Sequence, residues 1–146
     1  MAKTKGSIAI IGLGRHTVAL AYLANKAGRK VMVWKPEKEV PPSGPIRLPK
    51  AILVSNDLAE ACSHARLLIL SVPAEEVSER VCEMGAHVSW DQILIHCIKG
   101  MRRDGDRLVR MAEIIQAKSC LKKIGALSGP IPDGRSVATQ FGAAVA

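Results

Sequence analysis

The sequence predicts an α/β fold with a doubly wound, mainly parallel sheet. Three observations favour this fold: short apolar runs alternate with helical segments, the runs are apolar on both faces, and glycine or proline separates the elements. Helices bury strands of this kind from both sides, so we expect three layers, α/β/α, joined by right-handed crossovers. The 146 residues have the length of one domain, residues 1–146.

Apolar runs that end at turn or breaker residues mark the strands. The predicted strands are Ser7–Ile11, Lys30–Trp34, Ile52–Val54, Leu67–Val72, Gln92–Cys97 and Lys123–Leu127. Alanine, leucine and capping residues between them predict helices. These helices are Val18–Ala27, Leu58–Ser63, Ala74–Met84 and Asp104–Gln116. Gly28 ends the first of them as a C-terminal glycine does.

The remaining segments include the loops in which a ligand is expected. Residues 35–51 are rich in proline and charge and predict a long surface loop, and residues 1–6 a flexible N-terminus. In a doubly wound sheet, ligands bind beyond the carboxyl ends of the strands. The segments that follow strands are Gly12–Thr17, Lys35–Glu39, Val72–Ala74, Ile98–Met101 and Ser128–Asp133.

Composition and charge narrow the function classes. No apolar run approaches the roughly 18 residues of a membrane span, and the first residues lack the pattern of a signal peptide. The net charge of +8 suggests binding to nucleic acid. However, two Trp, one Tyr and one Phe are too few to form a surface on which bases stack, and the basic residues are scattered along the chain, so we do not expect nucleic acid as a partner. The four cysteines have no metal-ligand spacing, so we expect reduced thiols, no metal site and a cytoplasmic location.

A glycine-rich turn, GLGRHT at 12–17, follows the first strand. Gly12 fits the tight turn of a dinucleotide-binding (Rossmann) unit, and Gly14 fits the close approach of a pyrophosphate to the N-terminus of the next helix. Leu13, Arg15 and His16 complete the predicted cofactor loop. The turn therefore predicts NAD or NADP as cofactor, and the alternative is a glycine turn with a structural role only.

Two residues bear on how well a cofactor binds and which one. Thr17 stands where the fingerprint has its third glycine, which predicts a displaced helix or a lower affinity, although its hydroxyl could donate to a phosphate oxygen. Lys35 follows the second strand, where an acidic residue normally holds the ribose 2′-hydroxyl of NAD and a basic one accommodates NADP. Lys35 thus favours NADP, and a solvated strand-end lysine is the alternative.

The predicted ligand edge also holds a lysine and a proline. Lys99, in CIKG at 97–100, follows a buried strand. A lysine there can neutralise an anionic substrate or polarise a carbonyl group, so it is the candidate catalytic residue, with an ordinary surface charge as the alternative. Val72 and Pro73 end the preceding strand and are expected beside the cofactor.

An ordered series of short motifs resembles the N-terminal domain of NAD(P)-dependent glycerol-3-phosphate dehydrogenase over about residues 8–130. The series is GLG at 12–14, VMVW at 31–34, LP at 48–49, NDLAEA at 56–61, SVPAEEV at 71–77, IKG at 98–100 and LSGP at 127–130. The resemblance implies hydride transfer between the nicotinamide and sn-glycerol 3-phosphate or dihydroxyacetone phosphate. It also implies that Gly12 and Gly14 line the pyrophosphate, that Pro73 lies beside the cofactor and that Lys99 faces the substrate. Reductases that act on ketopantoate or 3-hydroxy acids share the first strand and its glycines, so the fold alone does not separate them from this family. The motifs IKG and SGP, in that order, favour the glycerol phosphate enzyme over these reductases.

The sequence also departs from this family. The resembling family has a motif that looks like GxGxWGTALA, and at the same place this chain reads GLGRHTVALA. His16 and Thr17 therefore stand where that motif has an aromatic residue and a glycine. After SGP the chain reads IPDGRSVATQ in place of a phenylalanine–alanine–glutamate segment. The family further implies a second, helical domain that supplies another lysine and the phosphate-binding residues, for which 146 residues leave no length.

These departures predict a cofactor-binding domain that is truncated or completed by a partner, with little turnover of its own because one wall of the cleft is missing. The apolar tail QFGAAVA favours truncation. Two alternatives stay open. One is a non-catalytic regulatory or interaction module that has lost the cofactor, and the other is an oligomer in which one subunit closes the cleft of another.

Overall fold

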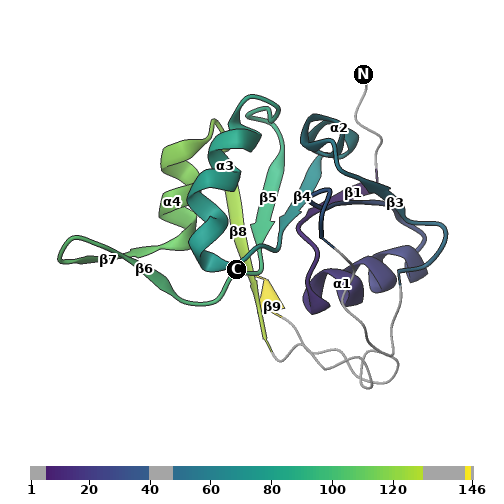
Figure 1. Cartoon of the computed structure of the whole chain (residues 1–146), viewed down its shortest axis with the longest axis horizontal. Helices are drawn as coiled ribbons and strands as arrows, with labels where there is room; N and C mark the ends of the chain where they lie inside the picture. The colour runs from purple at the N-terminus through teal and green to yellow at the C-terminus, as the bar shows by residue number, and fades with distance from the viewer. Residues whose placement is uncertain (1–5, 40–47, 130–143, 146) are drawn as a thin grey trace.

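The computed structural model describes residues 6–39, 48–129 and 144–145. Within them, one sheet has seven strands in the order β3-β2-β1-β4-β5-β8-β9 (Figure 1). The strands are β1 Ser7–Ile11, β2 Lys30–Trp34, β3 Leu53–Ser55, β4 Leu67–Leu70, β5 Ile93–His96, β8 Lys123–Ser128 and β9 Ala144–Val145. The first six in this list are parallel, and β9 pairs antiparallel with β8. The doubly wound, mainly parallel fold is confirmed.

The strand order reverses at the centre of the sheet. From β1 the chain adds β2 and β3 on one side, then returns to place β4 and β5 on the other side of β1. The carboxyl ends of β1 and β4 therefore diverge into loops that leave in opposite directions. Such a switch point opens a crevice for a ligand.

Helices cover both faces of the sheet. They are α1 Arg15–Lys26, α2 Leu58–His64, α3 Val77–Gly85 and α4 Met111–Lys118, with a 3₁₀ turn, η1 Ala74–Glu76, before α3. Alternate residues of β1 enter different apolar clusters: Ile10 packs with side chains of α1, and Ile11 packs with side chains of α2, α3 and α4. On the second face, α3 and α4 lie side by side (Figure 1). The predicted three layers are thus present.

Backbone hydrogen bonds continue the sheet beyond the ends of its strands. The N–H of Gly12 donates to the carbonyl of Trp34 at 3.0 Å, and the N–H of Ser71 donates to the carbonyl of Ile11 at 2.8 Å. The N–H of Cys97 donates to Leu70 O at 2.9 Å in the same way. The first residue after each of these strands is therefore fixed by its neighbour, and the loops begin from a common edge.

The prediction of a helix over Asp104–Gln116 was wrong in its first half. Residues 101–110 form a β-hairpin, β6 Met101–Asp104 and β7 Arg107–Arg110, and α4 begins only at Met111. Gly105 lies at the first central position of the turn with φ of +59°, as a type II′ turn requires. The local turn chemistry of Gly105-Asp106 thus prevails over helix propensity, and the hairpin projects from the body of the molecule (Figure 1).

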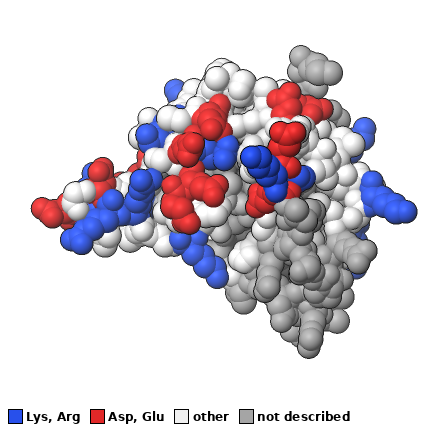
Figure 2. All heavy atoms as spheres, in the orientation of Figure 1, with Lys and Arg blue, Asp and Glu red and all other residues white. Residues whose placement is uncertain are grey.

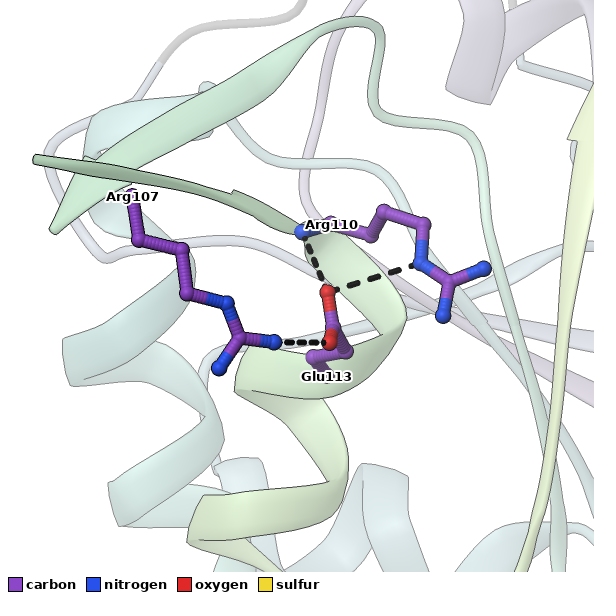
Figure 3. Close-up of polar contacts among 3 residues, drawn as sticks. All are labelled: Arg107, Arg110 and Glu113. Carbon is purple, nitrogen blue, oxygen red and sulfur yellow. Dashed lines mark hydrogen bonds and ion pairs between the residues drawn. The ribbon is translucent and has the colours of Figure 1, made fainter.

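One carboxylate joins this hairpin to the helix that follows it (Figure 3). Oε2 of Glu113 accepts from the backbone N–H of Arg110 at 2.8 Å and from its Nε at 3.4 Å, and Oε1 accepts from Nη2 of Arg107 at 2.8 Å. Glu113 thereby caps the N-terminus of α4 from its third position. These hydrogen bonds join β7 to the first turn of α4.

Other predicted boundaries shift by a few residues. The helix predicted from Val18 begins at Arg15, because Gly14 serves as its N-cap, and the third strand is 53–55 instead of 52–54. Some predictions lie wholly or partly outside the described residues: the N-terminus 1–6, the loop 35–51, the segment 128–133 and the tail QFGAAVA.

Candidate cofactor site

Gly12 occupies a position in which only glycine fits. Its φ is +113°, and a Cβ built on it would lie 2.0 Å from the carbonyl oxygen of Ser71. The chain turns sharply here because it must pass over the start of the loop after β4. Gly12 therefore plays the tight-turn role that the sequence predicts.

Gly14 differs from Gly12, since its backbone is extended, with φ of −114°, and would accept any residue. A Cβ built on Gly14 would meet no atom within 4 Å. The missing side chain thus leaves open space directly in front of the N-terminus of α1, whose first turn has no acidic residue. This is the space in which a pyrophosphate contacts a fingerprint loop, because the helix N-terminus carries partial positive charge there.

Thr17 is fully buried, and its side chain turns toward the backbone of the loop. Its Oγ1 accepts a hydrogen bond from the N–H of Gly14 at 3.2 Å. Thr17 does not line the cavity described next, so the structure does not place its hydroxyl where a phosphate would bind. The hydroxyl group instead serves the loop itself, as the acceptor for the N–H of Gly14.

A cavity of about 670 Å³ opens along the carboxyl edge of the sheet, from β2 across β1 and β4 to β5. Of the predicted site residues, Gly12, Leu13, Gly14, His16, Val72, Pro73 and Lys99 line it. Lys35 does not line it, and Arg15 is described only through its backbone as the first residue of α1. The cavity is also lined by residues of the segments in which the sequence analysis expects a ligand, namely Pro36, Lys38, Glu39, Ala74 and Ile98. Sequence reasoning did not single out Trp34, Ser71, Glu76 and Cys97, which line it as well. Trp34, Ser71 and Cys97 lie at or directly after the end of a strand, and that position is the signal that would have found them.

The side chain of Lys35 turns away from the cavity. Its Nζ donates to the carbonyl oxygens of Pro36, Glu37 and Glu39 at 3.4, 3.3 and 2.7 Å. These three bonds stabilise the turn after β2 and hold the ammonium group at its base. The cation that this segment presents to the cavity is Lys38.

Trp34 forms a fixed wall at the β2 end of the cavity. Its Nε1 donates to the carbonyl of Asn56 at 3.1 Å, and the guanidinium of Arg80 lies 4.5 Å from the centre of its ring. Arg80 in turn forms an ion pair with Glu83 and lies 4.0 Å from Glu76, which lines the cavity. Trp34 is thus held by two contacts and is only 5% exposed, so it forms a fixed, apolar part of the cavity wall.

The other end of the cavity carries Lys99 and two titratable neighbours. Lys99 is exposed in the turn after β5. Burial, and secondly the charge of Lys99, lower the pKa of His16. Burial raises the pKa of the Cys97 thiol to about 11, so it is protonated at neutral pH. This end therefore offers a lysine cation, a neutral imidazole and an uncharged thiol.

Several other features limit what this site can be. In the described ranges, no group of three or more His, Cys, Asp or Glu residues could hold a metal ion. No helix in the same part of the chain is long and apolar enough to cross a membrane. All four cysteines, Cys62, Cys82, Cys97 and Cys120, are free. On the face that Figure 2 shows, basic side chains are interspersed with acidic ones, which gather over α3.

Comparison with known proteins agrees with this geometry. The family described as "NAD-dependent glycerol-3-phosphate dehydrogenase N-terminus" matches residues 7–139. A glycerol-3-phosphate dehydrogenase [NAD(P)+] of Rhodopseudomonas palustris is 34% identical over 134 residues, covering 85% of this chain and 40% of that protein. The corresponding protein of Bradyrhizobium diazoefficiens is 29% identical with the same coverage.

A solved structure shows the same fold. The glycerol-3-phosphate dehydrogenase of Saccharomyces cerevisiae superposes with a TM-score of 0.82 at 18% identity, covering 98% of this chain and 47% of that one. The chain thus spans about 40% of the length of the curated relatives it matches.

Proposed function

The chain belongs to the family of N-terminal domains of NAD-dependent glycerol-3-phosphate dehydrogenase, and from this premise we propose that its cavity binds NAD or NADP. Gly12, Leu13, Gly14 and the first turn of α1 hold the pyrophosphate. The Trp34 end receives the adenosine, and the end with Pro73 and Lys99 receives the nicotinamide. The reduced nicotinamide, when bound, supplies a hydride.

The observation that carries this proposal is the contrast between the two glycines. Gly12 has no room for a Cβ because the fold itself fills the space, whereas at Gly14 a Cβ would meet nothing. Packing within the described residues gives no reason for the missing side chain of Gly14. A ligand that approaches the backbone closely does give one.

We propose that Lys99 is the catalytic cation of this domain. Its ammonium is placed to bind the anionic substrate or to polarise the carbonyl oxygen at C2 of dihydroxyacetone phosphate, which favours hydride addition at that carbon. Because the chain spans about 40% of its relatives' length, turnover requires a further part, supplied by the same polypeptide or by a partner chain. The free cysteines support a cytoplasmic location for this activity.

One observation favours a second function, a non-catalytic module that keeps the fold without the cofactor. The hydrogen bond from Gly14 to Thr17 occupies an N–H group of the loop that would otherwise be available to a pyrophosphate. If this bond prevails, the loop is closed on itself, and the domain acts only through its surface.

Thermal unfolding in the presence of NADH or NADPH separates the two functions. A nucleotide at about 100 times its Kd stabilises the folded state by about 2.7 kcal/mol, so the melting temperature rises with ligand concentration. Gly14→Val is the matched control, because its side chain fits the protein but fills the ligand's space. A rise in the original chain that is absent in Gly14→Val supports the proposal. No rise with either nucleotide at millimolar concentration leaves the non-catalytic module.

A further inference from the structure

His16 and Lys99 reach one cavity from two different elements. His16 is the second residue of α1, and Lys99 lies in the turn after β5. Both line the cavity, and the charge of Lys99 acts on the imidazole of His16. The two side chains are therefore near enough for their charges to interact within the same space.

Side chains of both charges line the cavity that contains His16. Lys38 and Glu39 from the turn after β2, and Glu76 from η1, line the same cavity, but the charge that acts on the pKa of His16 is that of Lys99. The N-terminus of α1 adds partial positive charge beside it. A neutral histidine, a lysine cation and a helix N-terminus thus line one cavity, and an anion bound there would favour the protonated form of the histidine.

We propose that His16 and Lys99 together bind a phosphate group of the ligand, and that binding places a proton on His16. The inference rests on the proposed function, because it adds a titratable contact to the dinucleotide site. Two ligands carry the required chemistry: the cofactor, with its pyrophosphate, and a phosphorylated substrate, with its monoester. Both offer oxygen anions that accept strong hydrogen bonds from a protonated imidazole and an ammonium group.

The direction of the coupling follows from electrostatics. In the free protein, burial and Lys99 favour the neutral imidazole and lower the pKa of His16. A phosphate oxygen beside the ring favours the charged form and raises that pKa. Affinity is therefore highest below the free pKa and falls by up to about tenfold per pH unit until the pH reaches the bound pKa. Between the two values, each binding event takes up as much as one proton.

Isothermal titration calorimetry measures this proton directly. The chain is titrated with NADH, NADPH or sn-glycerol 3-phosphate in two phosphate-free buffers of different ionisation enthalpy, at about pH 6 to 8, where histidine titrates. His16→Gln removes the titratable ring and keeps a polar side chain. His87→Gln, in the exposed turn after α3, is the matched control. An NMR titration of the His16 ring in the unaltered chain, with and without ligand, gives the same answer without any variant.

Each outcome decides between the inference and the proposed function. Proton uptake in the unaltered chain and in His87→Gln, but not in His16→Gln, supports the inference. Uptake with both NADH and NADPH assigns the pyrophosphate that the two nucleotides share, and uptake with NADPH alone assigns its 2′-phosphate. Uptake with sn-glycerol 3-phosphate alone assigns the monoester of the substrate. If the nucleotides bind with no proton uptake, or with equal uptake in His16→Gln, the inference is wrong and the proposed function stands.

Two further outcomes complete the test. If neither nucleotide binds but sn-glycerol 3-phosphate binds with uptake at His16, the proposed function is wrong and the phosphate site stands. If no probe binds, both are wrong. Lys99→Gln adds an independent check, because removing the ammonium must raise the pKa of His16 in the free protein.

Discussion

The N–H of Gly14 donates a hydrogen bond to Oγ1 of Thr17, 3.2 Å away, inside the loop that binds the pyrophosphate in related folds. A glycine at position 17 would leave the N–H of Gly14 without this acceptor, whereas the hydroxyl of Thr17 occupies that N–H group. The loop keeps its shape because the hydroxyl caps it from within. A ligand must either break this bond or bind to the remaining N–H groups.

We expect Thr17→Ala to bind NADH more tightly than the unaltered chain. The change frees the N–H of Gly14, and one such hydrogen bond contributes about 0.5–1.5 kcal/mol, or roughly 2- to 13-fold in affinity. NADH fluorescence titration measures the difference. Thr17→Ser keeps the hydroxyl and is the matched control, so equal affinities of the two variants would contradict the role of this bond.

Gly12→Ala is expected to destabilise the fold strongly. The new Cβ would lie 2.0 Å from the carbonyl oxygen of Ser71, at a φ of +113°. The backbone must move, which costs about 3 kcal/mol or more. Urea unfolding measures the loss. Gly28→Ala, at φ of +74° with no atom within 4 Å of its Cβ, is the control and should cost only about 1 kcal/mol. Similar losses at both positions would show that the close approach to Ser71 has no effect.

Gln92→Leu should weaken the contact between α2 and the sheet. The Nε2 of Gln92 donates to the carbonyl oxygens of Cys62 and Ala65, each at 2.7 Å, and Gln92 is fully buried. Leucine leaves these carbonyls without that donor, which costs about 2–3 kcal/mol. Calorimetric unfolding measures the loss. Gln116→Leu, on the exposed end of α4, is the control and should leave stability nearly unchanged. A loss below 1 kcal/mol for Gln92→Leu would exclude this anchoring role.

The hairpin is expected to loosen at low pH. The backbone N–H of Arg110, first among several causes, lowers the pKa of Glu113. The folded pKa lies below the unfolded one, so the contribution of Glu113 is present at neutral pH and is lost as the pH falls through the folded value. Glu113→Gln should increase amide hydrogen exchange at Arg110 at neutral pH, whereas Glu79→Gln, on the exposed side of α3, should not. Unchanged exchange at Arg110 would show that the carboxylate does not hold the hairpin.

Sequence patterns predicted the sheet well because its signals are local. The apolar runs at Ser7–Ile11 and Lys30–Trp34 are strands with the predicted bounds, and Gly12 makes the tight turn that its place after the first strand predicts. The hairpin was missed because a single Gly-Asp turn, at Gly105 and Asp106, outweighed a helix-like pattern. The outcome depends on the positive φ of Gly105, and the spacing of apolar residues along the sequence contains no information about that angle.

The rim of the site was harder to predict than its glycines. The side-chain amine of Lys35 bonds to carbonyls of its own turn, and no residue pattern shows where a flexible ammonium group ends. The wall formed by Trp34 and Arg80 depends on how α3 sits over β2. Contacts between distant segments of this kind follow from packing and not from spacing along the chain.

The hydrogen bonds that extend the strands at Gly12, Ser71 and Cys97 join backbone atoms only. The floor of the cavity is therefore held by peptide groups and, at Gly12, by the absence of a side chain, while side chains of different charge form the rim. Substitutions at the rim can accumulate without disturbing the floor. In such a domain, the rim side chains can diverge widely in sequence, and the bound ligand can change with them, while the fold is retained.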